Sequence, residues 1–376
     1  MLIYKAFPAY YTYLNQYHKC HPSFGRLSFN EQLARLKRDF FPWVLSWSQF
    51  NTDDKVEVFE TIHNDYYLQQ SWCDNLYIND PDWEKKIVLE QIRALQPDVC
   101  LIYPPEFFSN SFVDQVRDVV THEVIVGGYD GMNRKNIRLY DGFDFVITCS
   151  KYICDYYKAN GKTTFALEFG FDPKVLSSLT PSEGRYPVSF SGSIFEGIHD
   201  DRFELLSYLE RKRTKVVISS EFEMDMRYSL LSRKMFRSIK RGTFGDFYDR
   251  YLIRSYNKGP LYGREMFQFL SDSDITINLH GDGITFAANV RLYEATGVGA
   301  CLLTDWKHNI GEIFEPDKEI VTFQSKEEAY DKIKFLNRHE NTKKEIARNG
   351  QRRTLSDYTY ASRIPDAIRF VKQLCE

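Results

Sequence analysis

The chain has 376 residues, of which 43% are apolar and 27% charged, and its net charge is −3. This is the balance of a globular protein, and it gives no reason to expect nucleic acid as a partner. A chain of this length is long for one hydrophobic core, so two domains are expected. No apolar run approaches the length that spans a bilayer, and the N-terminus MLIYKAFPAYY lacks a signal-peptide core, so we expect a cytoplasmic protein.

The cysteines and aromatic residues say little about function. Seven cysteines form no C-x-x-C pair, which argues against a disulfide framework or a zinc knuckle. Aromatic residues make up 16% of the chain, and several cluster near its start, as in FPAYY and FFPW. Such rings stack on sugars in an acceptor site, but they are more often part of a core or an interface, and both interpretations stay open.

The first half of the chain predicts alternating strands and helices. Strands are expected at 2–7, 56–61, 99–103, 124–126 and 145–148, and helices at 30–47, 81–95, 111–120 and 151–159. This alternation is typical of a parallel sheet. No G-x-G-x-x-G motif follows these strands, so a dinucleotide-binding domain of the dehydrogenase kind is not expected.

A glycine-rich turn, GGYDG, follows the strand at 124–126. Its glycines allow close approach of a ligand, and Asp130 would project from the carboxyl end of the sheet. A carboxylate there can take the proton of an acceptor hydroxyl, which makes Asp130 the candidate catalytic base. The alternative is that this Asp-Gly pair is ordinary turn chemistry.

A hinge is expected at 171–187, where proline and glycine punctuate a polar run. The strand that follows, at 188–191, ends at Gly192 and Ser193 and precedes a helix that contains Arg202. Small residues at such a turn let main-chain N–H groups approach a pyrophosphate, with Arg202 as a charge partner. The alternative is that Arg202 only balances the acidic residues around it.

The stretch at 211–258 is unusually basic. Such a face would attract an anionic membrane that carries a lipid-linked acceptor. The alternative is a solvated charged face.

The pattern of a β-α-β unit occupies 273–305. Residues 275–279 alternate as a strand that ends at His280 and a G-D-G loop. A helix is expected from Ala287, with Thr285 as its cap, and 300–303 predict a second buried strand. Helices are also expected at 325–336, 341–350 and 358–374, the last with an apolar face.

Polar side chains gather at the ligand end of this β-α-β unit. Arg291 offers a fork of donors to phosphate oxygens, and Glu294 can accept from ribose hydroxyls. The alternative is that Arg291 and Glu294, three residues apart, form a simple surface ion pair.

Three motifs resemble, in order and spacing, the nucleotide-sugar half of group 1 glycosyltransferases, and in particular their CgeB-like branch. They are INLHGD, AANVRLYEATGVGACLLTD and NIGEIFEPDKEIVTFQSKEEA. The resemblance is specific over 262–363. It implies an α/β protein of the GT-B fold, in which two Rossmann-like domains face each other across a cleft. The acceptor-side domain would be 1–178 with a returning helix at 358–376, and the donor-side domain 179–357.

One position departs from the family pattern. Glu294 matches the second glutamate of the family's paired-glutamate motif, but Phe286 stands where retaining members carry the first. The stereochemistry and the way the sugar hydroxyls are held are therefore left open.

The resemblance implies a hexosyltransferase-type glycosyltransferase that moves a sugar from a nucleotide-sugar donor to a carbohydrate or surface-glycan acceptor, without a metal ion or a cofactor. Donor binding is expected at Gly192, Ser193, Arg202, Asn289, Arg291 and Glu294. His280 is expected to face the sugar or the leaving group and to donate a hydrogen bond to the leaving oxygen. Two alternatives stay open: a nucleotide-sugar epimerase or hydrolase on the same fold, and a non-catalytic nucleotide-sugar-binding module. The inner face of the membrane is a further expected location.

Overall fold

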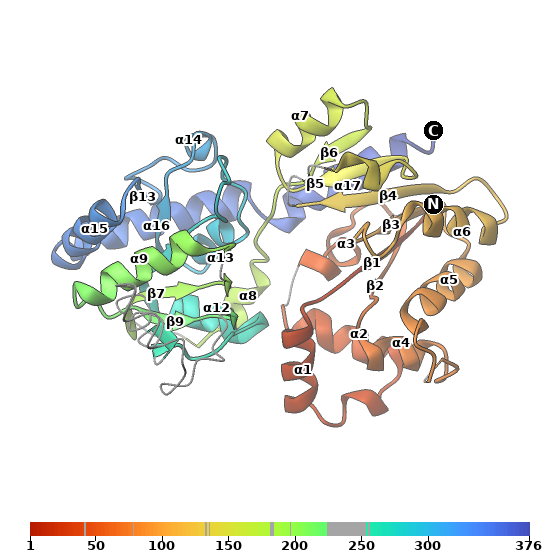
Figure 1. The fold of residues 1–376 in the computed structure, drawn as a ribbon, viewed down its shortest axis with the longest axis horizontal. Coiled ribbons are helices and arrows are strands. Elements are labelled where there is room, and N and C mark those ends of the chain that lie inside the picture. The colour runs from red at the N-terminus through yellow and green to blue at the C-terminus, as the bar shows by residue number, and fades with distance from the viewer. Residues whose placement is uncertain are drawn as a thin grey trace, which may run out of the picture. The chain divides into compact units, whose positions relative to one another are not determined.

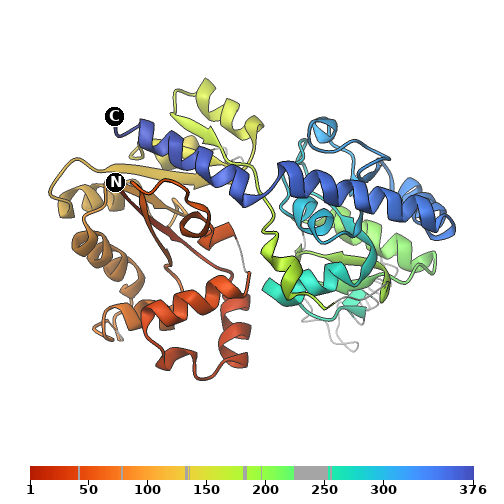
Figure 2. The same cartoon turned by 180° about the vertical axis from the view of Figure 1, so that it is seen from behind.

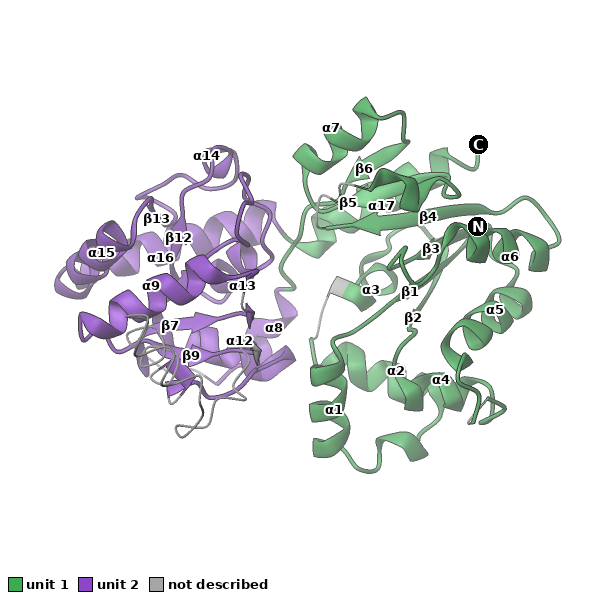
Figure 3. Ribbon diagram, in the orientation of Figure 1, with its two compact units in different colours: residues 1–172, 359–376 green, residues 173–358 purple. Residues whose placement is uncertain are grey.

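The computed structural model describes residues 1–40, 43–77, 79–131, 134, 136–180, 184–195, 197–223, 253–254 and 256–376. The chain forms two compact units, unit 1 of Met1–Asp172 with Thr359–Glu376, and unit 2 of Pro173–Tyr358 (Figure 3). The boundary lies before the expected position after residue 178, because helix α8 (Lys174–Ser178) and the residues after it join unit 2. There the main-chain N–H of Thr180 donates to Gln268 Oε1 at 2.8 Å.

Unit 1 is built on a 6-stranded parallel sheet (Figure 1). Its order is β2-β1-β3-β4-β5-β6, and the strands are β1 (Leu2–Phe7), β2 (Glu57–Ile62), β3 (Val99–Ile102), β4 (Ile125–Asp130), β5 (Phe145–Thr148) and β6 (Thr164–Ala166). The chain order changes direction between β1 and β3, because β2 pairs with one edge of β1 and β3 with the other. All five strands expected in this half of the chain are present.

The helices of unit 1 connect these strands. They are α1 (Tyr11–Cys20), α2 (Phe29–Arg38), α3 (Trp47–Phe50), α4 (Tyr66–Trp72), α5 (Trp83–Leu95), α6 (Asn110–Val119), α7 (Lys151–Ala159) and α17 (Tyr360–Gln373), with short 3-10 turns η1 (Phe24–Arg26), η2 (Trp43–Leu45) and η3 (Ile137–Tyr140). The single helix expected at 30–47 is wrong: α2 ends at Arg38, and Phe40 has a positive φ of 56°, which an α-helix does not accept.

The C-terminal helix α17 packs on unit 1. Ile364, Ile368 and Val371 are buried, and the ring of Phe370 stacks on that of Phe165 in β6 with centroids 5.0 Å apart. Figure 2 shows α17 lying along the strands of this unit. The apolar face expected in 358–374 is therefore the face that α17 buries.

Unit 2 is built on a 5-stranded parallel sheet of order β13-β12-β11-β7-β9 (Figure 1). The strands are β7 (Tyr186–Ser191), β9 (Val217–Ser219), β11 (Ser273–Asn278), β12 (Cys301–Asp305) and β13 (Val321–Phe323), and a separate parallel pair joins β8 (Ile194–Phe195) to β10 (Phe222–Glu223). The chain order reverses between β7 and β11. In open α/β sheets this reversal opens a crevice at the carboxyl ends of the two strands, where ligands bind.

The central strands of unit 2 form its core. In register, Ile275 lies beside Val188 and Ile277 beside Phe190, and all four are at most 1% exposed. Burial of each such side chain contributes about 1.5–3 kcal/mol. The helices around this core are α8, α9 (Asp200–Arg211), α12 (Gly263–Ser271), α13 (Arg291–Gly297), α14 (Ile310–Ile313), α15 (Lys326–Arg338) and α16 (Glu340–Asp357).

Within the described residues, no helix combines the length and the apolar character needed to cross a bilayer. The basic stretch at 211–258 falls largely in 224–252, outside the described residues. Contact with a membrane therefore stays a prediction.

Candidate functional site

The loops at the carboxyl ends of β7, β11 and β12 bring together most of the residues expected to act in unit 2. Gly192 and Ser193 follow β7, His280 lies two residues beyond β11, and Asp305 ends β12. Because β7 and β11 flank the point where the strand order reverses, this edge of the sheet is the candidate ligand site.

His280 is held by the end of the neighbouring strand. The register pairs Asn278 with Thr304, which sets the next residue, Asp305, beside His280. Oδ1 of Asp305 accepts hydrogen bonds from the main-chain N–H of His280 at 3.2 Å and from its Nδ1 at 2.8 Å. The histidine is 5% exposed, and its Nε2 is buried without a hydrogen-bond partner among the described residues.

Charges around Asp305 keep its carboxylate ionised. Burial acts to raise its pKa, but the hydrogen bond and charge of His280, together with the charge of Lys307, lower this pKa to about 2. Lys307 Nζ lies 3.0 Å from Oδ2 of the same carboxylate. An ionised carboxylate only accepts hydrogen bonds, so the proton of a neutral His280 lies on Nδ1 and Nε2 carries a lone pair. Donation from Nε2 to a leaving oxygen requires the imidazolium form.

The loop after β12 fixes the loop after β11. Asn309 Oδ1 accepts from the main-chain N–H of Ala287 at 2.6 Å, and its Nδ2 donates to the carbonyl of Ala287 at 3.1 Å. Lys307 Nζ donates to the carbonyl of Ile284 at 2.6 Å, and His308 Nδ1 lies 2.6 Å from the carbonyl of Thr285. The site loop is therefore tied at successive residues to a segment distant in sequence.

These ties correct the expected start of the helix. It begins at Arg291 rather than Ala287, because both main-chain groups of Ala287 are bonded to Asn309. Thr285 is not its cap: the residue before the helix is Val290, and Asn289 Oδ1 accepts from the main-chain N–H of Arg291 at 2.9 Å. Asn289 thus orders the first turn of α13, and its expected contact with phosphate stays a prediction.

Arg291 and Glu294 form an ion pair that is mostly buried. Arg291 Nη1 lies 2.8 Å from Glu294 Oε2, and the two side chains are 13% and 14% exposed. Burial raises the pKa of Glu294, and the charge of Arg291 opposes this. The pair is therefore not a solvent-exposed surface ion pair, and binding of ribose by Glu294 stays a prediction. Phe286, which replaces the first glutamate of the family pattern, is 8% exposed and packs as an apolar residue.

The groups around β7 that were expected to bind a pyrophosphate form hydrogen bonds to main-chain carbonyls of unit 2. The guanidinium of Arg202 donates to the carbonyl of Leu279 at 2.9 and 3.2 Å and to that of Ser193 at 2.7 Å. The main-chain N–H of Gly192 donates to the carbonyl of Ser219 at 3.2 Å. Arg202 therefore links the turn after β7 to the residue before His280. Binding of phosphate by Arg202, as predicted, would be a second role beside this structural one.

The start of α9 lies at the same edge of the sheet. The carboxylate of Asp282 accepts from the main-chain N–H groups of Asp200 at 2.6 Å and of Asp201 at 3.4 Å. An internal anion thus sits on the positive end of this helix.

Asp130 lies in unit 1, at the end of β4, and is 0% exposed. Its Oδ1 accepts from Arg134 Nη1 at 2.7 Å, and its Oδ2 accepts from the main-chain N–H of Arg134 at 3.1 Å and from the hydroxyl of Tyr157 at 2.8 Å. The other candidate residues described above belong to unit 2. With both oxygens bonded, Asp130 has a structural role here, and its role as a base stays a prediction.

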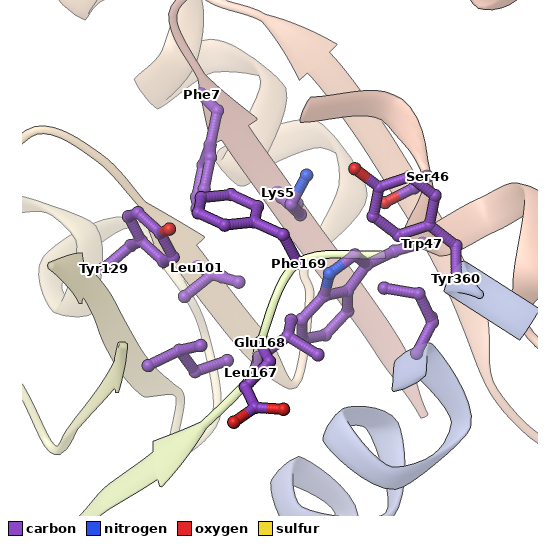
Figure 4. Close-up of a pocket in the computed structure, with 12 residues that line it drawn as sticks. Lys5, Phe7, Ser46, Trp47, Leu101, Tyr129, Leu167, Glu168, Phe169 and Tyr360 are labelled. Carbon is purple, nitrogen blue, oxygen red and sulfur yellow. The ribbon is translucent and has the colours of Figure 1, made fainter. Parts of the chain in front are cut away.

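A pocket in unit 1 collects several of the aromatic residues (Figure 4). It is lined by Lys5, Phe7, Ser46, Trp47, Leu101, Tyr129, Ile147, Leu167, Glu168, Phe169, Tyr360 and Ile364. Trp47 is 2% exposed and Ile147 0%, so these walls are closely packed. The pocket therefore favours core packing over an open sugar platform for these rings.

No group of three or more His, Cys, Asp or Glu side chains is placed to hold a metal ion within the ranges that the structure describes. Reaction without a metal stays a prediction.

Sequence reasoning missed Asp305, Lys307 and Asn309 as parts of the site. The signal was present, because they end or follow the strand beside His280. Parallel strands place their carboxyl ends at one edge, so polar residues after neighbouring strands are expected to meet.

Comparison with known proteins supports the predicted family and fold. The profile of a family described as "Glycosyl transferase-like" matches residues 227–369. A search of curated proteins finds no match.

Three solved structures resemble the chain. HepE from Anabaena, in complex with UDP-glucose, has a TM-score of 0.61 and 11% identity over 100% of this chain and 99% of that chain. TarM from S. aureus has a TM-score of 0.54 and 12% identity over 76% and 58%. Sucrose-phosphate synthase from Thermosynechococcus elongatus has a TM-score of 0.53 and 12% identity over 77% and 78%.

At these identities the structural likeness shows the fold alone, and it confirms the predicted α/β class with two Rossmann-like units. The CgeB-like branch stays a prediction. Residues 227–369 match the glycosyl transferase-like family, in a chain that has the GT-B fold of the solved structures it resembles.

Proposed function

We propose that the chain is a metal-independent glycosyltransferase that moves a hexose from a nucleotide-sugar donor to a carbohydrate or surface-glycan acceptor. The observation that carries this proposal is the match of residues 227–369 to the glycosyl transferase-like family. That range contains His280, Arg291 and Glu294, at the edge of the sheet where the strand order reverses.

A nucleotide-sugar donor is supported by the structures that share the fold. HepE was crystallised with UDP-glucose, and TarM with UDP. For this chain we infer a donor of the same chemical class, with its ribose at Glu294. Its diphosphate would lie by Asn289, Arg291 and the Gly192-Ser193 turn, with Arg202 behind that turn.

The reaction requires the acceptor oxygen to bond to the anomeric carbon as the bond from that carbon to the donor phosphate oxygen breaks. The nucleoside diphosphate leaves with the bonding electrons, and the acceptor hydroxyl loses its proton. Arg291 would stabilise the negative charge that grows on the leaving group. Asp130 is the proposed proton acceptor. In that role it would have to exchange its bond to Arg134 or Tyr157 for one to the acceptor.

The test is a thermal-shift screen of nucleotide sugars, followed by product analysis with and without candidate glycans. The proposal expects one donor to raise the melting temperature and its sugar to appear on a glycan. Donor consumption that is equally fast without acceptor would identify an epimerase or a hydrolase instead. Donor binding without any turnover would identify a non-catalytic binding module.

A further inference from the structure

We infer that Nε2 of His280 accepts a hydrogen bond from a hydroxyl group of the donor's sugar, and that Asp305 is the positioning residue that holds the imidazole in the tautomer this contact needs. The inference rests on the proposed function for the identity of the ligand. The tautomer itself follows from the geometry of unit 2.

The first observation is the state of Nε2. It is buried and has no hydrogen-bond partner among the described residues, while the side chain that carries it is 3% exposed. Buried polar atoms are nearly always paired, because an unpaired one loses its bonds to water without compensation. His280 also lies at the edge of the sheet where ligands of such folds bind. A ligand group is therefore the expected partner of Nε2.

The second observation is the set of groups around Asp305. Its Oδ1 accepts from the main-chain N–H of His280, from its Nδ1 and from the hydroxyl of Thr304 at 3.2 Å, and its Oδ2 lies 3.0 Å from Lys307 Nζ. Lys307 supplies a countercharge to this carboxylate, so the carboxylate stays ionised beside a neutral imidazole. Nδ1 must then be the donor in the bond to Asp305, because the ionised carboxylate has no proton to give.

This tautomer decides which ligand group can meet His280. A neutral imidazole protonated on Nδ1 has only a lone pair at Nε2, so its partner must donate. Oxygens of an ionised diphosphate, including the leaving oxygen, cannot donate. Sugar hydroxyls can. The contact thus falls on the hydroxyl-bearing part of the donor rather than on its phosphates.

The position of the imidazole is fixed from two sides. Arg202 donates to the carbonyl of Leu279, the preceding residue. Asp305 accepts from the main-chain N–H and from Nδ1 of His280. A group fixed in this way discriminates between ligands that differ by one hydroxyl, because an analogue that lacks the hydroxyl leaves Nε2 unpaired. His280 is thereby assigned a role in donor specificity.

The tautomer is tested first, without any ligand. The full-length chain is labelled with 15N-histidine, and the signals of His280 are assigned among its 8 histidines by comparison with His280→Gln. We expect Nδ1 to carry the proton and Nε2 to show the shift of an unprotonated ring nitrogen near neutral pH. In Asp305→Asn this signature should be lost or mixed, while the fold persists. Protonation on Nε2 alone in the wild-type chain overturns the inference.

The contact is tested by calorimetry with the donor found in the thermal-shift screen and with its analogues that lack single sugar hydroxyls. In the wild-type chain one analogue should bind about tenfold more weakly than the donor, as expected for one lost hydrogen bond. In His280→Ala the donor and that analogue should bind equally, whereas His280→Gln, whose amide oxygen can accept, should keep part of the difference. This double-mutant cycle separates the contact between His280 and the hydroxyl from any general loss of donor affinity that the substitution causes.

The control variant is His122→Ala in unit 1. His122 also faces an aspartate, with Nε2 3.7 Å from Asp98, but the two side chains are 40% and 44% exposed. It should retain the full discrimination. If the donor binds and every analogue penalty is unchanged in His280→Ala, the inference is wrong while the proposed function stands. If no nucleotide sugar binds the wild-type chain, the proposed function fails, and the tautomer measurement alone decides the role of Asp305.

Discussion

Nδ1 of His280 lies 2.8 Å from Oδ1 of Asp305, across the ends of the neighbouring strands β11 and β12. The bond depends on strand register, because pairing of Asn278 with Thr304 is what sets Asp305 beside His280. It also places an ionised carboxylate, paired with Lys307, at the edge of the sheet where a donor would bind. Replacement of Asp305 is therefore expected to change both the stability of unit 2 and the binding of the donor.

Stability should fall in acid as Asp305 becomes protonated. Its pKa is lowered from 3.8 to about 2 in the folded chain, so its contribution is complete above about pH 4 and is lost as the pH falls through 2. At pH 7 the wild-type chain should be more stable than Asp305→Asn by about 2 kcal/mol. The measurement is urea unfolding from pH 7 to pH 2.

The difference between the two chains should shrink below about pH 4, since Asp305 then becomes protonated in the unfolded chain while it stays ionised in the folded chain down to about pH 2. Asp331→Asn, at an exposed position of α15, is the control and should change stability little at any pH. A difference that stays constant over the whole pH range would contradict the assigned pKa direction.

Replacement of Glu294 by alanine should weaken nucleotide binding, and it should also lower stability because Arg291 loses its partner in a mostly buried ion pair. Loss of a charged hydrogen bond to ribose should reduce the free energy of binding by about 1.5–3 kcal/mol. Calorimetry with the donor nucleotide gives the affinity, and Glu327→Ala, at an exposed position of α15, provides the matched control. An unchanged affinity in Glu294→Ala would remove ribose binding from its role.

Removal of the Asn309 side chain should loosen the site loop. Asn309→Ala leaves the buried main-chain N–H and carbonyl of Ala287 without their present partners, at a cost of about 1–3 kcal/mol for each unpaired group. Asn309→Asp keeps the acceptor but lacks the donor, so its effect should be intermediate. Hydrogen exchange of the Ala287 amide measures the effect directly, and equal protection in all three chains would show that the tie does not order the loop.

The helix α17 should be needed for the stability of unit 1. Ile368 is 2% exposed, and Ile368→Ala should cost about 2–5 kcal/mol, because it removes buried methyl groups and leaves a cavity. The neighbouring Arg369, which is exposed and pairs with Asp366 on the same helix, gives the control Arg369→Ala. Truncation before Tyr358 should damage the protein further. A truncated chain with wild-type melting temperature and activity would contradict this placement of the helix.

Local patterns predicted the strands and many of the helices of the fold. β1, β5 and α7 have the expected bounds, because short apolar runs mark the two strands and a serine cap marks the helix in the sequence. The sequence analysis did not predict α1, where Tyr13, Leu14 and Tyr17 are buried at helical spacing. The aromatic cluster FPAYY overlaps the start of α1, and its rings obscure the helical period of the apolar residues that follow.

The site was predicted only in part, because its geometry comes from pairs distant in sequence. His280 was identified from the end of its own strand, but Asp305 and Lys307 depend on the register between β11 and β12. The late start of α13 likewise depends on Asn309, which competes for the main-chain groups of Ala287. The periodicity of one segment does not show which residues of another segment will lie beside it.

The most direct test of the proposed function is turnover of a nucleotide sugar in the presence of an acceptor glycan, measured at saturating donor with the melting temperature recorded on the same samples. The wild-type chain should attach the sugar to the glycan. His280→Ala should be slower by about a hundredfold at nearly unchanged melting temperature, because the reacting sugar loses a contact that positions it. Absence of transfer by the wild-type chain with every donor tested would contradict the glycosyltransferase assignment, and more than about half of wild-type turnover in His280→Ala would contradict its place at the reacting sugar.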